Sequence, residues 1–312
     1  MVRAVLVVNP RATATTAAGR DVLAHALASA VKLDVVETDY RGHAMAAARQ
    51  ATIDGVDLVV AHGGDGTVNE VVNGLLGPVN GPSPAGPSTS TPTLGVVPGG
   101  SANVFARALG LPRDPVEATH ALLRAIEHGR GRRVGLGSAD GRWFTFNAGV
   151  GWDADVVAGV ERKRAKRAGP LLYARTAAAC YLRPSGRLPR LTVELPGEPA
   201  RSGLRMAFIS NTDPWTYLGK RPVHLNAGCT FDGGLGLYAL STLRLPTVLR
   251  HLRQALSDRG QQHGAQLLRR DDVARVRVVA ERPVRLQVDG DLVGDRSTVE
   301  FISVPDALTV AI

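Results

Sequence analysis

The chain has 312 residues, 44% hydrophobic and 21% charged, a balance that excludes an intrinsically disordered protein. Its 37 basic and 28 acidic residues give a net charge of +9, which favours anionic partners such as phosphates, nucleic acid or an acidic membrane surface. The length predicts two domains, because a single hydrophobic core rarely grows beyond about 250 residues.

No run of 18 apolar residues occurs, so the sequence predicts no transmembrane helix. The opening apolar stretch is too short for a signal peptide and is typical of a first strand, so we expect a cytoplasmic protein. Aromatic residues make up only 4%, which leaves few platforms for base stacking. Because no base-reading module is visible either, nucleic acid is not an expected partner.

Strand and helix patterns alternate over the first predicted domain, residues 1–133. We expect strands at 4–8, 33–38, 57–61 and 94–97. We expect helices at 16–30, 43–53 and 68–76, and one that follows Gly99-Gly100 and runs through Leu109. Strands followed in turn by helices predict a parallel sheet with helices on both faces. Residues 77–92, rich in Pro, Gly and Ser, predict a surface loop.

The second predicted domain, residues 134–312, is rich in strand patterns. We expect strands at 132–137, 143–150, 191–195, 204–210, 235–240, 273–279 and 284–288, interrupted by helices at 155–183 and 246–258. The pattern favours a sandwich-like fold, and the prediction leaves open that the last strands return to the first domain.

The segment HGGDGTVNE, residues 62–70, follows a buried strand and opens a helix. Glycines there let backbone N–H groups approach a phosphate, and Thr67 and Glu70 have the spacing of a capping box. A plain capped turn explains the glycines but not Asp65, since a carboxylate in a phosphate loop repels its ligand unless a cation lies between them. Asp65 therefore favours a Mg²⁺-bound nucleotide, and the plain turn stays open as the alternative.

A second glycine turn, PGGSAN at residues 98–103, follows the next strand, with Ser101 as a candidate helix N-cap or phosphate donor. Two such turns at the carboxyl ends of neighbouring strands would frame the crevice where open α/β sheets bind ligands. Asn9-Pro10 ends the first strand at the same edge, although Asn-Pro is also common in ordinary loops. Neither a Walker A loop nor a dinucleotide GxGxxG follows a strand.

Two carboxylates flank a glycine in VDGD, residues 288–291. A hydroxyl-phosphorylating enzyme can use such a carboxylate to accept the proton. On the residues alone a plain hairpin turn is the better explanation, because Asp-Gly is the strongest short-range hairpin signal. Asp232-Gly233-Gly234 has the same two interpretations.

A basic run, ERKRAKR at residues 161–167, precedes an apolar helical stretch at 171–182. It is either a solvated helix face or a patch that contacts anionic lipid headgroups. The histidines and the two cysteines lack zinc-ligand spacing, so a zinc site is not expected.

Four segments occur in order: HGGDGTVNEVVNGL, PGGSANVFARALGLP, FNAGVGWDA and VDGD. Together they resemble the catalytic family of diacylglycerol kinases, which includes bacterial lipid kinases and is similar to sphingosine kinases. The GGDGTxNE segment is shared with NAD kinases, whereas the two later segments favour the lipid kinases. The resemblance implies ATP in a cleft between an α/β domain and a β-rich domain. It implies Mg²⁺-dependent transfer of the γ-phosphoryl group to the hydroxyl of diacylglycerol or a related lipid. The enzyme would act peripherally at an anionic membrane surface, and a homodimer stays open.

The resemblance also implies roles for individual residues. Asp291 is the implied proton acceptor, with Asp289 and Asp65 as alternative bases; Asp65 organises Mg²⁺, and Asp232 holds a second, structural Mg²⁺. The implied nucleotide contacts are Asn9, Pro10, Arg11, Ala12, Thr13, Thr38, Gly63, Gly64, Asp65, Gly66, Thr67, Val68, Asn69, Glu70, Gly99, Gly100, Ser101 and Asn103.

Three departures from the family pattern keep alternatives open. The usual NPxSG lacks its Ser and Gly here, although Arg11 could pair with phosphate instead. The last acid of DGE is the shorter Asp291, and the acids of DDGLLD are replaced at Phe231 and Gly236. The alternatives are a soluble-substrate NAD kinase and a catalytically weak lipid- or nucleotide-binding protein.

Overall fold

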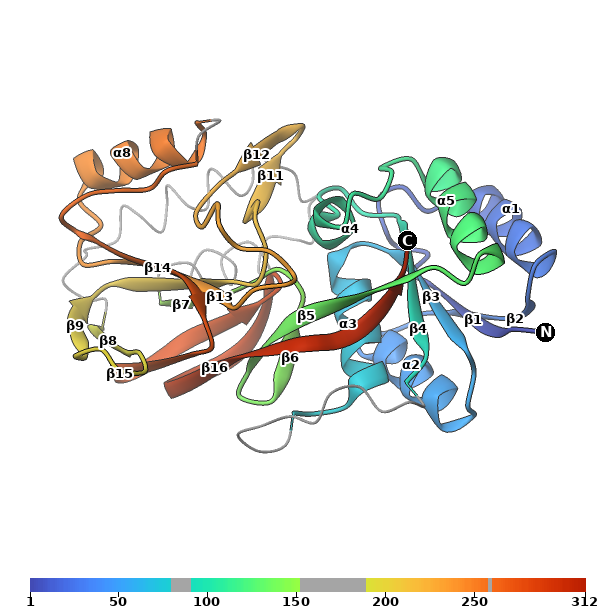
Figure 1. Cartoon of the computed structure of the whole chain (residues 1–312), viewed down its shortest axis with the longest axis horizontal. Helices are drawn as coiled ribbons and strands as arrows, with labels where there is room; N and C mark the ends of the chain where they lie inside the picture. The colour runs from blue at the N-terminus through green and yellow to red at the C-terminus, as the bar shows by residue number, and fades with distance from the viewer. Residues whose placement is uncertain (80–90, 152–188, 258–259) are drawn as a thin grey trace. The chain divides into compact units, whose positions relative to one another are not determined.

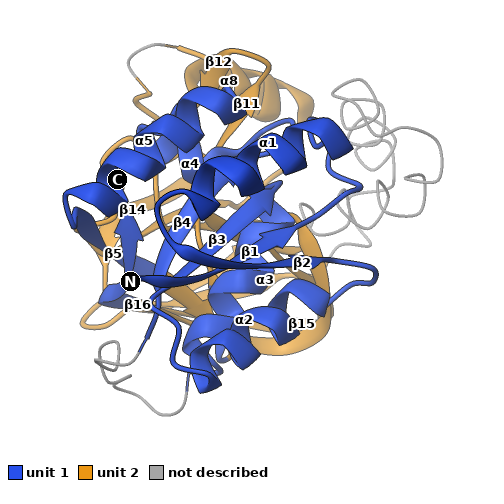
Figure 2. Cartoon of the chain, turned by 90° about the vertical axis from the view of Figure 1, so that its right-hand side faces the viewer, with its two compact units in different colours: residues 1–136, 141–143, 304–312 blue, residues 137–140, 144–303 orange. Residues whose placement is uncertain are grey.

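The computed structural model describes residues 1–79, 91–151, 189–257 and 260–312. The chain forms two compact units (Figure 2): unit 1 comprises residues 1–136, 141–143 and 304–312, and unit 2 comprises residues 137–140 and 144–303. The predicted basic run 161–167, the apolar stretch 171–182, the predicted helix 155–183 and most of the predicted loop 77–92 lie outside the described residues.

The elements of unit 1 alternate along the chain as the sequence predicts up to residue 108, and a further helix that was not predicted follows directly (Figure 1). They are β1 (Arg3–Val8), α1 (Ala17–Ala28), β2 (Lys32–Glu37), α2 (His43–Ile53), β3 (Leu58–Gly63), α3 (Asp65–Leu76), β4 (Thr93–Pro98), α4 (Val104–Ala108) and α5 (Pro115–Glu127). Four parallel strands pair in the order β2-β1-β3-β4. Helices α1 and α5 cover one face of this sheet and α2 and α3 the other, which confirms the predicted α/β fold class (Figure 2).

The strands β1, β3 and β4 are buried on both faces because they are almost entirely aliphatic, whereas the edge strand β2 is mostly exposed and carries Lys32, Asp34 and Glu37. Leu6 and Val8 of β1 pack with Leu27 of α1 and Leu122 of α5 in one core cluster. On the opposite face α2 and α3 cross closely at Gly74, where a Cβ atom would collide with the carbonyl of Met45. This two-sided packing fixes the carboxyl ends of β1, β3 and β4, from which the loops of the candidate site emerge.

Unit 2 is built on antiparallel strands, as predicted for the β-rich half. The remaining strands are β5 (Gly131–Ala139), β6 (Arg142–Phe144), β7 (Asn147–Gly151), β8 (Leu191–Glu194), β9 (Arg201–Leu204), β10 (Met206–Ser210), β11 (Thr216–Leu218), β12 (Arg221–Val223), β13 (Leu235–Leu240), β14 (Leu267–Val273), β15 (Arg275–Val288) and β16 (Asp291–Ala311), with helix α8 (Leu245–Ala255) after β13. Of these, β5, β6 and β16 have residues in both units. The main order is β14-β13-β10-β7-β15, and β15 continues into β16 through a tight hairpin. Strand β16 pairs with β15 in its first part and, at Val310, with β4 in unit 1.

No helix among the described residues combines the length and the apolar character needed to cross a bilayer.

Candidate functional site

Three loops of unit 1 are tied together at the carboxyl edge of its sheet. The loop after β1 is joined to the turn after β4, because the Ala14 N–H donates to the Gly99 carbonyl at 2.8 Å. The turn after β4 is joined to the turn after β3, because the Gly99 N–H donates to the Gly63 carbonyl at 2.7 Å. The two predicted glycine turns and the Asn9 loop therefore form one structural unit.

Close backbone packing explains the glycines of the second turn. A Cβ atom on Gly100 would lie 2.6 Å from the Cα atom of Gly64, and one on Gly99 would lie 3.1 Å from that of Gly63. Gly66 differs, because nothing lies within 4 Å of the position of its Cβ atom. Protein packing therefore accounts for Gly99 and Gly100 but leaves open space in front of Gly66, in the first turn of α3.

The N-terminus of α3 is capped by Gly64, which has no side chain to accept its first amides. The predicted capping box is wrong: Glu70 accepts hydrogen bonds from the amides of Gly42 at 2.8 Å and Ala44 at 3.2 Å, and so caps α2 instead. The first amides of a helix have no carbonyl partner within the helix. Such a terminus next to open space is a suitable binding site for a phosphate group.

Asp65 is the first residue of α3, and its side chain is partly exposed. Its Oδ1 atom accepts a long hydrogen bond, 3.3 Å, from the Phe105 amide near the start of α4. Asp65 thus links the start of α3 to α4 while its side chain remains partly exposed.

Asn103, rather than Ser101, is the N-cap of α4. It has a left-handed backbone, with φ of 48°, and its side chain accepts from the Gly100 amide at 2.9 Å and donates to the Gly100 carbonyl at 2.8 Å. The predicted N-cap role of Ser101 is therefore wrong. Ser101 is exposed, so a role as phosphate donor remains a prediction.

Asn9 connects the β1 loop to α3. Its amide nitrogen donates to the Thr67 hydroxyl at 3.1 Å, and its Oδ1 atom accepts from the Arg11 amide at 3.0 Å. Pro10, Arg11 and Thr13 are exposed beside it. The loop therefore presents Arg11 to solvent at the same edge of the sheet as the glycine turns.

His62, near the end of β3, contacts the loop after β1. Its Nδ1 atom lies 3.1 Å from the Val97 carbonyl and so carries the ring proton, which leaves Nε2, 3.3 Å from the Thr15 hydroxyl, as an acceptor. Burial lowers the pKa of His62 and keeps the ring neutral. No local sequence pattern indicates the contact between Thr15 and His62, because the two residues are 47 positions apart along the chain.

Several predicted nucleotide contacts are directed at protein groups instead. Val68 is buried, and the Asn69 side chain donates to the Trp143 carbonyl at 2.9 Å. Thr38 is buried at the end of β2, where its amide donates to the Val8 carbonyl at 2.8 Å. These residues hold the loops in place, whereas the open space lies toward Gly66 and Asp65.

Asp65 offers one partly exposed carboxylate at the N-terminus of α3. The described residues contain no group of three His, Cys, Asp or Glu side chains that could hold a metal. Mg²⁺ is usually held by one or two carboxylates together with substrate phosphates and water, so a single carboxylate beside a phosphate site fits it.

The Asp232 loop of unit 2 is held by protein contacts. Asp232 is exposed, the Gly234 amide donates to the Asp272 carboxylate at 2.6 Å, and the Cys229 carbonyl accepts from the Asp213 amide at 3.2 Å. A structural Mg²⁺ at Asp232 remains a prediction.

The DGD segment of unit 2 is the hairpin turn between β15 and β16. Val288 pairs with Asp291, and the two central residues, Asp289 and Gly290, have φ of 47° and 81°. Left-handed conformations at both central positions are those of a type I′ turn, for which Asp-Gly is a preferred pair. Asp289 therefore lies within the turn, and Asp291 is the first residue of β16.

Asp289 is buried and fully engaged by four hydrogen-bond donors. Its Oδ2 atom accepts from the amide and hydroxyl of Thr145 at 2.7 and 2.8 Å, and its Oδ1 atom accepts from the amides of Phe146 and Asn147, both at 3.1 Å. Burial raises the pKa of Asp289, and these four bonds act in the opposite direction. Asp289 holds the segment before β7, so the partly exposed Asp291 is the better candidate for a proton acceptor.

A parallel α/β unit with joined glycine turns, combined with an antiparallel β-rich unit, defines the fold class shared by diacylglycerol kinases and NAD kinases. Residues 3–137 match the family model of the diacylglycerol kinase catalytic domain. The chain is 30% identical over 263 residues to the diacylglycerol kinase of Bacillus subtilis (strain 168), covering 82% of this chain and 78% of that protein. The chain belongs to the diacylglycerol kinase family and is a lipid kinase, a phosphotransferase with an alcohol group as acceptor.

Solved structures share this fold. A putative diacylglycerol kinase from Bacillus anthracis str. Sterne superposes with a TM-score of 0.76 at 20% identity, covering 99% of this chain and 96% of that chain. An NAD kinase from Archaeoglobus fulgidus in complex with ATP superposes with a TM-score of 0.54 at 11% identity, covering 99% of this chain and 93% of that chain. The predicted fold class is confirmed.

Proposed function

We propose that the chain transfers the γ-phosphoryl group of ATP to the hydroxyl of a diacylglycerol. The observation that carries this proposal is the open space at Gly66, beside Asp65 and at the N-terminus of α3. The names of the curated relative from B. subtilis, a diacylglycerol kinase, and of the A. fulgidus structure, an NAD kinase in complex with ATP, support the two substrates.

In this proposal the residues of unit 1 bind the triphosphate. The first amides of α3 donate to phosphate oxygens, and the partial positive charge of the helix terminus favours their negative charge. Arg11 is exposed at the same edge of the sheet and adds a positive charge there. Asp65 would hold Mg²⁺, which when bound neutralises charge on the phosphates.

Asp291 is the proposed proton acceptor. The lipid hydroxyl oxygen forms a bond to the γ-phosphorus, the bond to the bridging oxygen breaks, and ADP leaves while the hydroxyl proton passes to Asp291. Asp289, with both oxygens occupied by donors, maintains the turn that presents Asp291.

The test is an assay with radiolabelled ATP against dispersed short-chain diacylglycerol, ceramide, sphingosine and NAD. We expect label in a chloroform-soluble product of diacylglycerol, and loss of that product when EDTA removes divalent ions. Asp65→Asn should lower turnover by at least about 100-fold, because it removes a charge that acts on the transferred group.

The matched control is Asp21→Asn, since Asp21 is an exposed aspartate of α1 in the same unit, and it should keep wild-type turnover. Transfer of label to NAD alone, or binding of ATP without any transfer, would contradict the proposal in favour of an NAD kinase or a weak binding protein. Wild-type turnover in Asp65→Asn would refute the assignment of Asp65.

A further inference from the structure

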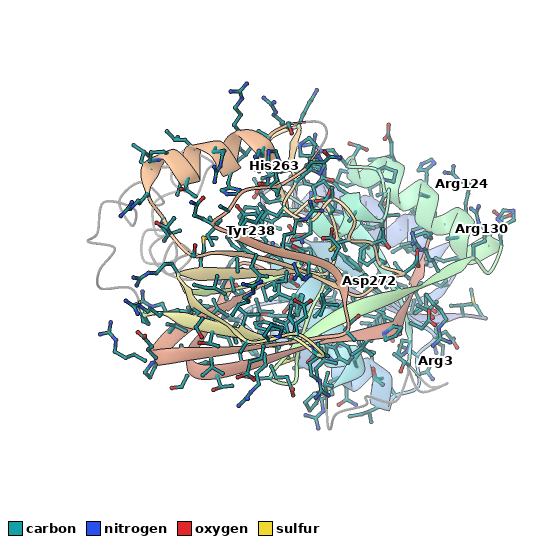
Figure 3. All side chains as sticks on the ribbon, turned by 60° about the vertical axis from the view of Figure 1, so that its left-hand side comes forward. Arg3, Arg124, Arg130, Tyr238, His263 and Asp272 are labelled. Carbon is teal, nitrogen blue, oxygen red and sulfur yellow. The ribbon has the colours of Figure 1, made fainter. Side chains whose placement is uncertain are left out.

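Helix α8 (Leu245–Ala255) has one face packed onto unit 2. His251 and Ala255 are buried, and Val248 packs against the cluster formed by side chains of β10 and β13. Tyr238 of β13 meets the His251 ring edge to face, with ring centroids 5.8 Å apart, and lies on the sheet side of the helix (Figure 3). This face of α8 is therefore packed against the core of unit 2.

A second apolar row runs along α8 outside that core. Leu245, Leu249 and Leu252 follow one another at spacings of four and three residues, which places them on one side of the helix. Their exposed fractions are 52%, 53% and 46%. Three half-exposed leucines in a row form a patch, unlike scattered single residues, and such patches typically mark a binding surface.

The surroundings of this row are basic. Residues 241–257 contain three arginines and no acidic residue. Arg244, Arg250 and Arg253 are all exposed, and Arg253 lies one helical turn beyond Leu249 on the same side. Apolar side chains edged by arginines complement an anionic lipid surface, which offers acyl chains below a layer of negative headgroups.

We propose that α8 is a membrane-docking helix. Its leucine row enters the headgroup boundary of a bilayer, and Arg250 and Arg253 contact anionic headgroups. This inference rests on the proposed function, because a diacylglycerol kinase must reach a substrate that resides in a bilayer. It places the membrane contact on described residues of unit 2.

The experiment is co-sedimentation of the full chain with vesicles of phosphatidylcholine, with and without phosphatidylglycerol. We expect binding that needs phosphatidylglycerol and that weakens between about 0.1 M and about 1 M salt, since salt screens the arginines. The variant L245Q/L249Q/L252Q should lose at least about tenfold in vesicle affinity, because glutamine keeps the helix but cannot enter the acyl boundary. R250Q/R253Q should lose about fivefold for each arginine.

Two control variants match these changes elsewhere on the surface. Leu218→Gln alters a leucine of β11 that is 50% exposed, and R124Q/R130Q removes two exposed arginines near the end of α5, both labelled in Figure 3. Both controls should sediment as the wild type does. Thermal unfolding of every variant verifies that the fold is retained.

Activity separates this inference from the proposed function. The α8 variants should phosphorylate dispersed short-chain diacylglycerol at the wild-type rate but lose activity on long-chain diacylglycerol embedded in vesicles. If the wild type does not phosphorylate dispersed diacylglycerol, the proposed function is wrong, whether or not the chain sediments with vesicles. If both α8 variants sediment with vesicles as the wild type does, α8 is not the docking surface. The proposal is also overturned if light scattering shows that the wild type is a dimer and that L245Q/L249Q/L252Q is a monomer, because the leucine row would then bind a second copy of the chain.

Discussion

The two units present the same local motif, an aspartate beside a glycine after a strand, in two different environments. Asp65 in unit 1 is partly exposed and accepts a 3.3 Å bond from the Phe105 amide. Asp289 in unit 2 is 6% exposed and accepts four bonds, two of them shorter than 2.9 Å. Burial and the number of donors, and not the motif, therefore decide whether such a carboxylate supports the fold or is available to a ligand.

The difference extends to the neighbouring aspartate. In unit 2 the two aspartates of the hairpin differ in their surroundings. Asp289 accepts hydrogen bonds from the backbone of residues 145–147, whereas Asp291, two residues later, is partly exposed. Asp289 is a poor candidate for the proton acceptor because it is buried and both of its carboxylate oxygens are already occupied by protein donors, which keeps them from a substrate hydroxyl. We therefore propose that Asp289 serves stability and that Asp65 and Asp291 serve the chemistry.

Asp291→Asn gives the largest expected effect. If Asp291 accepts the hydroxyl proton, the variant should lose about 100- to 10,000-fold in turnover of ATP with diacylglycerol, because asparagine cannot take up the proton. Its free energy of unfolding should stay close to that of the wild type, since the side chain is partly exposed. Steady-state kinetics and urea unfolding measure the two quantities.

The matched control is Asp295→Asn, an exposed aspartate four residues further along β16. It should leave both quantities unchanged. Equal activity of Asp291→Asn and the wild type would remove Asp291 from the mechanism and return the question to Asp289 or Asp65.

Asp289→Ala should act on stability first. Removing the carboxylate leaves four donors without their acceptor in a buried place, and each such group costs about 1–3 kcal/mol unless water reaches it. We expect a loss of about 3–5 kcal/mol in the free energy of unfolding, measured in urea. Asp289→Asn should lose less, because its one oxygen still accepts from two donors.

Asp306→Ala is the control for the backbone. Asp306 also has a left-handed backbone, with φ of 50° against 47° at Asp289, but its side chain is exposed. It therefore reports the cost of alanine at positive φ without the loss of a buried carboxylate. Similar losses at the two positions would show that the backbone, and not the four hydrogen bonds, makes Asp289 important.

The sequence predicted the elements of unit 1 well, because their hydrophobic patterns are local. Helix α2 has the predicted bounds, 43–53, and β4 differs from the predicted 94–97 by one residue at each end. Helix α5 was overlooked although Asp114 caps it and Pro115 opens it, which are local signals that a closer reading could have used. Strand β16 was not predicted, because its charged and small residues hide the alternation that pairs it with β15.

The residues of the candidate site could be predicted from the sequence, but their hydrogen-bond partners could not. The glycine turns and the DGD hairpin are visible as motifs, whereas their partners lie far along the chain. Thr145 meets Asp289 across 144 positions and Gly42 meets Glu70 across 28, so no local pattern could show that these acids are engaged. Only the folded chain shows that Asp289 and Glu70 are each engaged by several protein donors, whereas Asp65 and Asp291 stay partly exposed.

Two glycines of unit 1 allow the ligand-facing and protein-facing parts of the site to be separated. In Gly100→Ala the new Cβ atom would lie 2.6 Å from the Gly64 Cα atom, and two backbones cannot yield as a side chain would. We expect a loss of about 1–3 kcal/mol in the free energy of unfolding, together with weaker ATP binding. Urea unfolding and calorimetric titration with ATP measure the two effects.

Gly66→Ala is its counterpart and should show the opposite sign in stability. Nothing lies within 4 Å of the new Cβ atom, and alanine is favoured over glycine inside a helix by about 0.5–1 kcal/mol. Affinity for ATP should nevertheless fall by about tenfold if a phosphate occupies the open space. Unchanged affinity in this more stable variant would show that the space at Gly66 is not where the nucleotide binds.

The smallest expected effect is a dependence of stability on pH that arises from one buried histidine in each unit. Burial lowers the pKa of His62 in unit 1 and of His251 in unit 2 below the ordinary 6.5. Below pH 6.5 the unfolded chain binds protons that the folded chain does not, so the free energy of unfolding should fall as the pH falls, until each folded-state pKa is reached. Each histidine contributes at most about 1.4 kcal/mol for each pH unit.

His62→Gln separates the two contributions, because it removes one titrating group from unit 1 and leaves His251 in place. The variant should show a shallower slope of unfolding free energy against pH between pH 6.5 and 5, measured as the difference from the wild type so that the carboxyl groups cancel. An unchanged slope would mean that the His62 ring takes up a proton as readily in the folded chain as in the unfolded one. The link from Val97 through His62 to Thr15 would then not depend on a neutral ring, and the β1 loop would be held to the glycine turns by its backbone bonds alone.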